Sequence, residues 1–285
     1  MANIGFIGSG MMAEAIIGGM LKGGFSASEI WGSDPQISRR EYMQEKYGIT
    51  VTGDNKELVN ACNVLVLAVK PQYYGSVVPE LQKVLRSEHR IISIMAGITT
   101  ARMEEDLRSW KKVPKKAVVD TAQPAKPTGE ILSIIRVIPN TPAVVGAGIT
   151  AICAGSQVEQ ADMDLAKQIF SAVGSVVDAE EHLINAISGV SSCGPAYVYM
   201  MIQALADGGV MMGLPRHLAH KLAAEMVRGA AQMVLEDTGH PEELKDKVCS
   251  PGGTTIEGVY ALEKAGFRGA IMEAVKVGTE KFSRM

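Results

Sequence analysis

The chain has 285 residues, which is long enough for two domains that each bury a core. Hydrophobic residues make up 47% of the chain and charged residues 21%, which is the balance of an ordinary folded protein. The formal net charge of -3 gives no support for a nucleic-acid partner or an anionic membrane surface.

The four cysteines lie far apart, with no Cys-x-x-Cys pair and no histidine at metal-ligand spacing. We therefore expect reduced structural thiols and no metal site. The first strand follows Met1 without a secretory signal, and the most apolar stretch, residues 196–214, is interrupted by Gln203, Asp207 and paired glycines. This stretch is too short and too polar to span a membrane, so we expect a cytoplasmic protein.

The start of the chain joins a strand to a helix through a glycine-rich turn. An apolar run over residues 4–7 is followed by Gly8, Gly10 and Ala13 at G-x-G-x-x-A spacing. Gly8 permits the tight turn, Gly10 lets a pyrophosphate approach the backbone, and Ala13 lets the helix pack closely on the strand. Free N–H groups at the helix start would bind the phosphates, and Asp34 follows about two dozen residues later. This stretch predicts a dinucleotide site, with a glycine turn that binds no ligand as the alternative.

The rest of the first half alternates strands and helices. We expect strands at residues 29–32, 50–52, 62–69 and 90–95, and helices at residues 11–22, 38–47 and 77–85. Repeated strand–helix units predict a doubly wound parallel sheet, whose ligands bind beyond the carboxyl ends of the strands. Asp34, Lys70 and Ala96 all fall at such ends.

Residues 111–129 differ from their surroundings in composition. Six basic residues and one acidic residue lie between Arg108 and Lys126, together with prolines. We expect an exposed loop or hairpin here, with a basic binding patch as the alternative. Further strands are expected at residues 131–138, 149–154 and 175–178, around a helix over residues 159–173.

From Glu181 onward the strand signals end. Helices are expected at residues 183–188, 195–212, 215–237, 241–248, 255–264 and 267–282. The sequence thus predicts an α/β Rossmann-type nucleotide-binding domain over residues 1–180, followed by an all-helical domain over residues 181–285. The stretch 196–212 is too apolar for a solvent-facing helix in so small a domain, so we expect a dimer or a larger homo-oligomer.

Residues 249–256 read Cys-Ser-Pro-Gly-Gly-Thr-Thr-Ile and precede an apolar helical run. Backbone N–H groups and hydroxyls at a helix start bind anions, so this stretch predicts an anion site. An ordinary helix N-cap without a ligand is the alternative.

Together these motifs resemble those of the pyrroline-5-carboxylate reductase family, and the resemblance spans almost the whole chain. It is carried by residues 8–10, 68–71, 139–142, 191–197, 204–210, 212–216 and 244–255. The last of these motifs, which ends in Ser-Pro-Gly-Gly-Thr-Thr, is close to the family signature. The resemblance implies hydride transfer from NADPH or NADH to the C=N bond of 1-pyrroline-5-carboxylate, which gives L-proline in the last step of proline biosynthesis.

The resemblance also implies the residues of each site. The cofactor would be lined by Ile7, Gly8, Ser9, Gly10, Met11, Met12, Asp34, Asn55, Ala68, Val69, Lys70, Pro71, Met95 and Ala96. The imino-acid substrate would be bound by Glu181, Lys247, Gly252, Gly253, Thr254 and Thr255. The resemblance thus implies that the all-helical part, residues 181–285, is a dimerisation and substrate domain. Thr255 is the expected catalytic residue, with its hydroxyl hydrogen-bonded near the ring nitrogen or the carboxylate of the substrate.

The chain departs from the family pattern at three places. Residues 111–129 are extra, Ser192 and Cys193 replace the common Gly-Ser, and Asp34 replaces a common Ser or Asn. An acid at the end of the second strand accepts hydrogen bonds from ribose hydroxyls and repels a 2′-phosphate.

Arg39 and Arg40 follow Asp34 closely and would offset this repulsion. We therefore expect NADH to be used well and NADPH not to be strongly preferred. Two alternative functions stay open. One is another reductase of the β-hydroxyacid-dehydrogenase or imine-reductase type, which would lack Ser-Pro-Gly-Gly-Thr-Thr. The other is a cofactor-sensing protein without turnover.

Overall fold

The computed structural model describes residues 3–108, 130–236 and 239–284. The predicted insertion at residues 111–129 lies outside the described residues. The chain divides into two compact units, which are unit 1 (Met1–Ser192 with Thr279–Met285) and unit 2 (Cys193–Gly278). The domain boundary expected between residues 180 and 181 stays a prediction.

The described part of unit 1 is built on one sheet with the strand order β3-β2-β1-β4-β5-β6-β7-β8. The strands are β1 (Ile4–Ile7), β2 (Ile30–Ser33), β3 (Thr50–Thr52), β4 (Val64–Leu67), β5 (Arg90–Ser93), β6 (Ser133–Ile138), β7 (Gly148–Ala154) and β8 (Gly174–Asp178). The predicted Rossmann-type architecture is confirmed. The order reverses between β1 and β4, and such a switch point is where α/β sheets bind ligands.

The parallel arrangement predicted for the strands of the first half is confirmed for β1 to β5. β6 and β7 run antiparallel, whereas the other neighbouring strands are parallel. Only the short 3₁₀ segment η3 (Thr141–Val145) lies between β6 and β7. A parallel pair needs a crossover of a dozen or more residues, and this connection is too short for one.

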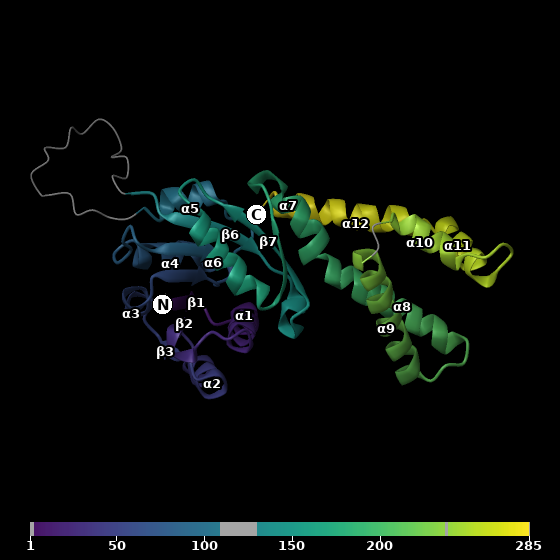
Figure 1. Ribbon diagram of the computed structural model, residues 1–285, viewed down its shortest axis with the longest axis horizontal. Helices are drawn as coiled ribbons and strands as arrows, with labels where there is room; N and C mark the ends of the chain where they lie inside the picture. The colour runs from purple at the N-terminus through teal and green to yellow at the C-terminus, as the bar shows by residue number, and fades with distance from the viewer. Residues whose placement is uncertain (1–2, 109–129, 237–238, 285) are drawn as a thin grey trace, which may run out of the picture. The chain divides into compact units, whose positions relative to one another are not determined.

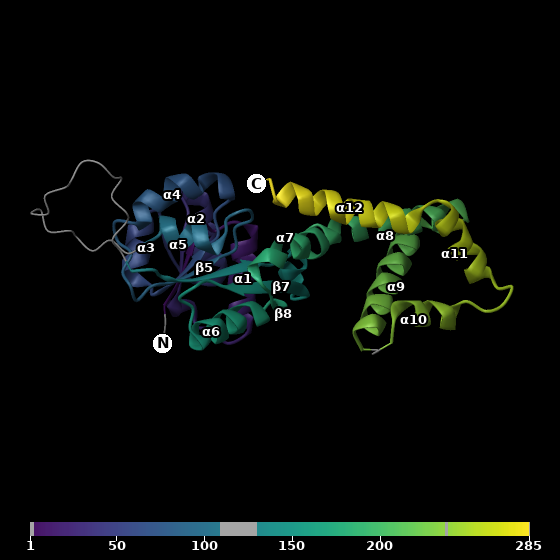
Figure 2. The same cartoon turned by 90° about the horizontal axis from the view of Figure 1, so that it is seen from above.

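Helices cover both faces of the sheet (Figures 1 and 2). On one face α1 (Met11–Lys22), α2 (Ile37–Tyr47) and α6 (Gln160–Ser171) bury apolar side chains in a core cluster that includes Phe6 and Val66. On the other face α3 (Asn55–Ala61), α4 (Tyr74–Leu81) and α5 (Thr100–Asp106) build a second cluster with Ile7 and Leu65. Successive side chains of a strand point to opposite faces, so β1 and β4 each contribute to both clusters.

Two helices of unit 1 have no counterpart among the expected elements. α3 and α5 have 7 residues each, which is too short to show an apolar period in the sequence. Each begins with a side-chain cap instead. The carboxylate of Asp54 accepts from the backbone N–H of Lys56, and the hydroxyl of Thr99 accepts from that of Arg102. Such a cap satisfies one of the N–H groups that a helix start leaves unpaired.

Beyond the sheet the described chain is helical, as expected. A short helix, α7 (Ile184–Ile187), is followed by α8 (Gly194–Met211), α9 (Arg216–Glu236), α10 (Pro241–Val248), α11 (Thr254–Lys264) and α12 (Phe267–Phe282). Within the described residues of unit 2, the buried apolar cluster consists of Ala206, Ala219 and Ala223. Many larger apolar side chains on these helices are exposed, among them Met200 at 74% and Tyr260 at 65%.

None of the described helices is both long enough and apolar enough to cross a membrane.

Candidate functional site

The turn from β1 to α1 needs glycine at its first position. Gly8 has a φ of +93°, and a Cβ at Gly8 would lie 2.9 Å from the carbonyl oxygen of Ala68. A Cβ at Gly10 would meet nothing within 4 Å, so the space beside this residue is open. α1 begins at Met11 with Gly10 as its N-cap, and no described side chain caps it. Open N–H groups at a helix start suit an anion such as a pyrophosphate.

Asp34 lies directly against this turn. Its Oδ2 accepts from the backbone N–H of Ser9 at 3.3 Å, and its Oδ1 accepts from the backbone N–H of Gln36 at 3.0 Å. A carboxylate at this place in a Rossmann fold accepts the ribose hydroxyls of a dinucleotide. Contact of Asp34 with a ribose stays a prediction.

Both arginines that follow Asp34 are engaged with backbone carbonyls. Arg39 donates through Nε to the carbonyl of Ser9 and through Nη2 to that of Gly10. Arg40 donates through Nη1 to the carbonyls of Asp34 and Pro35, at 2.7 and 3.1 Å. Hydrogen bonds to neutral carbonyls leave the positive charge of both guanidiniums in place, so their expected compensation of the Asp34 charge stays a prediction.

Most of the other predicted cofactor residues follow β3, β4 and β5, whereas Ile7 ends β1 and Met12 lies in α1. Because these strands run parallel beside β1 and β2, their carboxyl ends share one edge of the sheet. Ile7 and Met95 are buried in the core, whereas Lys70 is exposed. The amide of Asn55 accepts from the Ser33 hydroxyl at 2.7 Å and donates to Glu80 at 2.9 Å. Contact of each residue with a cofactor stays a prediction.

Glu181, a predicted substrate residue, is turned toward the sheet of unit 1. Its Oε2 accepts from the hydroxyl of Thr100 at 2.5 Å, and its Oε1 pairs with Arg136, which is 3% exposed. The thiol of Cys153 lies 3.6 Å from Oε2. Burial raises the pKa of Glu181, but the hydrogen bonds from Thr100 and Arg136 outweigh burial and leave the pKa below its ordinary value.

A carboxylate has about four acceptor sites, and these donors occupy most of them. The structure therefore gives Glu181 an anchoring role, tying η4 (Glu181–Leu183) to β6 and α5. Direct contact of Glu181 with a substrate stays a prediction.

The remaining predicted substrate residues lie in unit 2. Gly252 has a φ of +67°, and a Cβ at Gly253 would lie 2.3 Å from the hydroxyl oxygen of Ser250. Gly253 is the N-cap of α11, and no described side chain caps this helix. Thr254 and Thr255 are exposed, and Lys247 is exposed on α10. Because the N-cap is Gly253, the sequence alternative in which Thr255 caps the helix is not the observed arrangement.

A polar cluster on the flank of α1 was not expected from the sequence. The carboxylate of Glu14 accepts from Arg39 at 2.6 Å, Tyr42 at 2.8 Å, Lys46 at 3.0 Å and Tyr47 at 3.0 Å. Burial raises the pKa of Glu14, but the hydrogen bonds from Arg39, Lys46, Tyr42 and Tyr47 outweigh it and lower the pKa from 4.5 to about 2. The sequence does contain a signal for this cluster: α1 has an acidic residue in its first turn, and α2 is rich in basic residues and tyrosines.

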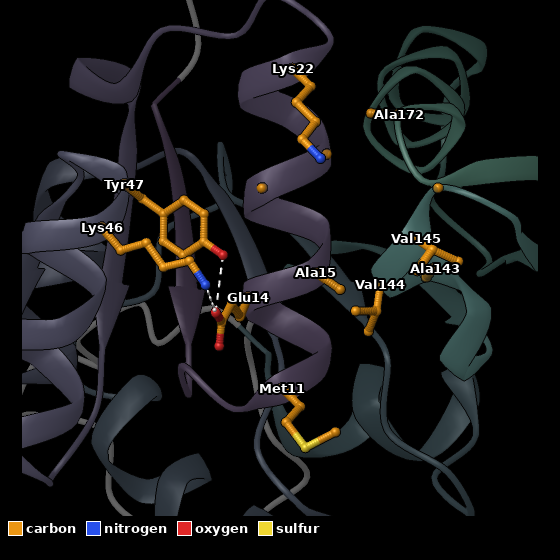
Figure 3. Close-up of a pocket in the computed structure, with 13 residues that line it drawn as sticks. Met11, Glu14, Ala15, Lys22, Lys46, Tyr47, Ala143, Val144, Val145 and Ala172 are labelled. Atoms are coloured by element: carbon orange, nitrogen blue, oxygen red, sulfur yellow. Dashed lines mark hydrogen bonds and ion pairs between the residues drawn. The ribbon is translucent and has the colours of Figure 1, made fainter. Parts of the chain in front are cut away.

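Figure 3 shows Lys46 and Tyr47 pointing at Glu14 and in contact with it, and all three side chains line a cavity of about 540 Å³. The cavity follows α1 and is lined on its other side by residues 143–146 and Ala172. Of the predicted cofactor residues it includes only Met11, so it extends along the helix flank and does not coincide with the glycine turn.

Comparison with known proteins gives a consistent result. Residues 181–285 match the profile described as pyrroline-5-carboxylate reductase dimerisation, and residues 3–97 match the one described as NADP oxidoreductase coenzyme F420-dependent. A pyrroline-5-carboxylate reductase from Synechocystis is 46% identical over 274 residues, which cover 96% of this chain and 94% of the relative. This chain belongs to the pyrroline-5-carboxylate reductase family. The resemblance inferred from the motifs is confirmed.

Solved structures of the family agree with this fold over nearly their whole length. The pyrroline-5-carboxylate reductase of Coxiella burnetii has a TM-score of 0.85 at 32% identity, covering 99% of this chain and 98% of that one. The pyrroline carboxylate reductase of Plasmodium falciparum, solved with NADP bound, has a TM-score of 0.84 at 30% identity, covering 99% and 97%.

The ionised form of Glu14 stabilises the fold, and this effect depends on pH. Because the folded pKa is about 2 and the ordinary value is 4.5, the stabilisation is complete above about pH 4.5 and is lost as the pH falls toward 2. We expect Glu14→Gln to lower the urea midpoint at neutral pH, and the difference from wild type to shrink in acid. Glu45→Gln, an exposed change on α2 outside the cluster, is the matched control. A Glu14→Gln difference that stays constant down to about pH 3 would contradict this account.

Proposed function

We propose that this chain reduces the C=N bond of 1-pyrroline-5-carboxylate with NADH or NADPH and forms L-proline, the last step of proline biosynthesis. The observation that carries the proposal is the match, over nearly the full length of both chains, to a relative named pyrroline-5-carboxylate reductase. A cytoplasmic location is proposed from the sequence alone.

The residues of unit 1 fit a nicotinamide dinucleotide. The open space beside Gly10 and the uncapped start of α1 suit the pyrophosphate, and the carboxylate of Asp34 suits the ribose. When bound, the reduced nicotinamide supplies the hydride for the imine carbon.

The residues of unit 2 would hold the substrate. Its carboxylate would accept hydrogen bonds from the backbone N–H groups of Thr254 and Thr255 at the start of α11, which no described side chain caps. The hydroxyl of Thr255 would donate to the carboxylate or contact the ring nitrogen. A protonated imine accepts hydride readily, so the chain needs no strong base beside the substrate.

The direct test is an assay of purified protein with 1-pyrroline-5-carboxylate and either NADH or NADPH. Loss of nicotinamide absorbance with stoichiometric formation of proline supports the proposal. Tight cofactor binding without turnover would favour the cofactor-sensing alternative. Turnover of other imines or of hydroxy acids, but not of this substrate, would favour a different reductase of the same architecture.

Asp34 should set the preference between the two cofactors. Its carboxylate repels a 2′-phosphate, and the neighbouring arginines are engaged with carbonyls. We expect Asp34→Ser to shift the ratio of kcat/KM for NADPH over NADH upward, on the order of tenfold, because one nearby like charge is removed. Asp164→Ser, the same change on the exposed face of α6, should leave the ratio unchanged. An unchanged ratio in Asp34→Ser would mean that residue 34 does not face the ribose.

Thr255→Val keeps the branched shape and removes one hydrogen-bonding oxygen. If that oxygen binds the substrate, the loss is one hydrogen bond to a charged group, about 1.5–3 kcal/mol. This corresponds to a roughly 10- to 100-fold lower kcat/KM for the imine, with the Kd for NADH unchanged. The melting temperature should hardly move, because Gly253 is the N-cap of α11. Lower stability with intact kinetics would remove Thr255 from the site.

We also propose a homo-oligomer whose unit is a dimer formed through the helices of unit 2. Its described apolar core is three alanines, and large apolar side chains on α8 such as Met200 and Tyr199 are exposed. Exposed apolar surface of this extent is typical of an interface. The matching family profile over residues 181–285, described as a dimerisation region, supports this proposal.

Sedimentation at micromolar concentration should therefore show a dimer or a larger assembly. Met200→Asp should weaken the association, because it places a charge on the exposed apolar face of α8. Ile37→Asp, at an apolar position of unit 1 that is also largely exposed, should not weaken it. A fully active wild-type monomer would contradict the proposal.

A further inference from the structure

The side chain of Arg39 contacts backbone carbonyl groups of the glycine turn. Its Nε donates to the carbonyl oxygen of Ser9 at 2.5 Å, and its Nη2 lies 3.4 Å from that of Gly10. The same Nη2 donates to Oε2 of Glu14 at 2.6 Å. One guanidinium therefore links two successive peptide groups of the turn to an acid in the first turn of α1.

The geometry of the peptide group fixes what lies on the opposite side. The C=O of Ser9 belongs to the same planar trans peptide as the N–H of Gly10, and the C=O of Gly10 to the same peptide as the N–H of Met11. In a trans peptide these two groups point in opposite directions. Because both carbonyls face Arg39, the N–H groups of Gly10 and Met11 face away from it. These are N–H groups at the helix start that suit a pyrophosphate.

Glu14 fixes the position of Arg39. Its carboxylate is 18% exposed and also accepts from Tyr42, Lys46 and Tyr47. The guanidinium carbon of Arg39 lies 5.0 Å from the ring centroid of Tyr42, within range of a cation–π contact. Arginine suits this position because its planar fork reaches several acceptors at once, which a lysine ammonium does not.

We propose that Arg39 and Glu14 are positioning residues, which hold the glycine turn so that the N–H groups of Gly10 and Met11 face the cofactor pyrophosphate. This inference rests on the proposed function. It separates two roles that an arginine near Asp34 can have. An arginine that binds a 2′-phosphate affects NADPH alone, whereas one that orients the turn affects NADH and NADPH equally, because both carry the same pyrophosphate.

The test is calorimetric titration of the full chain with NADH and with NADPH, without substrate, so that turnover plays no part. Arg39→Met should raise the Kd for both cofactors by the same factor, about tenfold, the scale of one hydrogen bond to an anion. Glu14→Gln should raise both by a smaller, equal factor, because a neutral amide holds Arg39 less firmly. Lys46→Met is the matched control. It removes a cation that contacts Glu14 but, among the described contacts, not the turn, and it should change neither Kd.

The other outcomes of this titration contradict either the positioning proposal or the proposed function. A rise for NADPH alone makes Arg39 a 2′-phosphate ligand and overturns the proposal. A lower melting temperature with both Kd values unchanged also overturns it, because the pair would then only stabilise the fold. If Arg39→Met does not fold, Glu14→Gln supplies the same comparison. If the wild-type chain binds neither cofactor, the proposed function itself is refuted. If the wild-type chain binds both cofactors and the variants bind them equally well, only the positioning role of Arg39 and Glu14 is refuted.

Discussion

The arrangement of the predicted cofactor site in unit 1 depends on one constraint, the close contact between Gly8 and the turn after β4. A Cβ at Gly8 would lie 2.9 Å from the carbonyl oxygen of Ala68 and 3.0 Å from a methyl carbon of Val69. The backbone ties the same place to both neighbouring strands, since Gly8 N–H donates to Ser33 and Ala68 N–H donates to Ile7. The turns after β1, β2 and β4 are therefore drawn together at the switch point of the sheet.

Two acidic residues beside this turn, Asp34 and Glu14, differ in whether a basic side chain neutralises them. The N–H of Ser9 donates to Asp34 while its C=O accepts from Arg39, so Ser9 is held from both of its backbone groups. Glu14 is neutralised by Arg39 and Lys46. Within the described residues Asp34 has no such ion pair, and its negative charge stays available to act on a ligand. A charge of this kind attracts a ribose hydroxyl and repels a 2′-phosphate, and its effect on the choice between NADH and NADPH stays a prediction.

The sequence predicted those features whose cause is local. The glycine spacing and the apolar strands of the first half each have their physical reason within a few residues, and the turn and these strands lie where they were expected. The antiparallel direction of β7 was not predicted, because strand direction depends on where the chain returns to the sheet. α3 and α5 were missed because they are stabilised by a cap and by packing, without a long apolar period. The pairing of Glu14 with Arg39 joins residues 25 positions apart in sequence, and no spacing rule finds such a pair.

The two predicted binding regions rest on different sources of stability. The glycine turn lies on a sheet whose buried strands pack against helices on both faces, so its geometry is fixed within one compact unit. The segment from Gly252 to Thr255 belongs to unit 2, whose described apolar core consists of three small side chains. Alanines bury little apolar area, so such a core contributes little free energy of folding. When association buries the exposed apolar side chains, it also stabilises the folded unit. The proposed self-association and the order of the substrate segment are then linked, whereas the cofactor turn is formed without association.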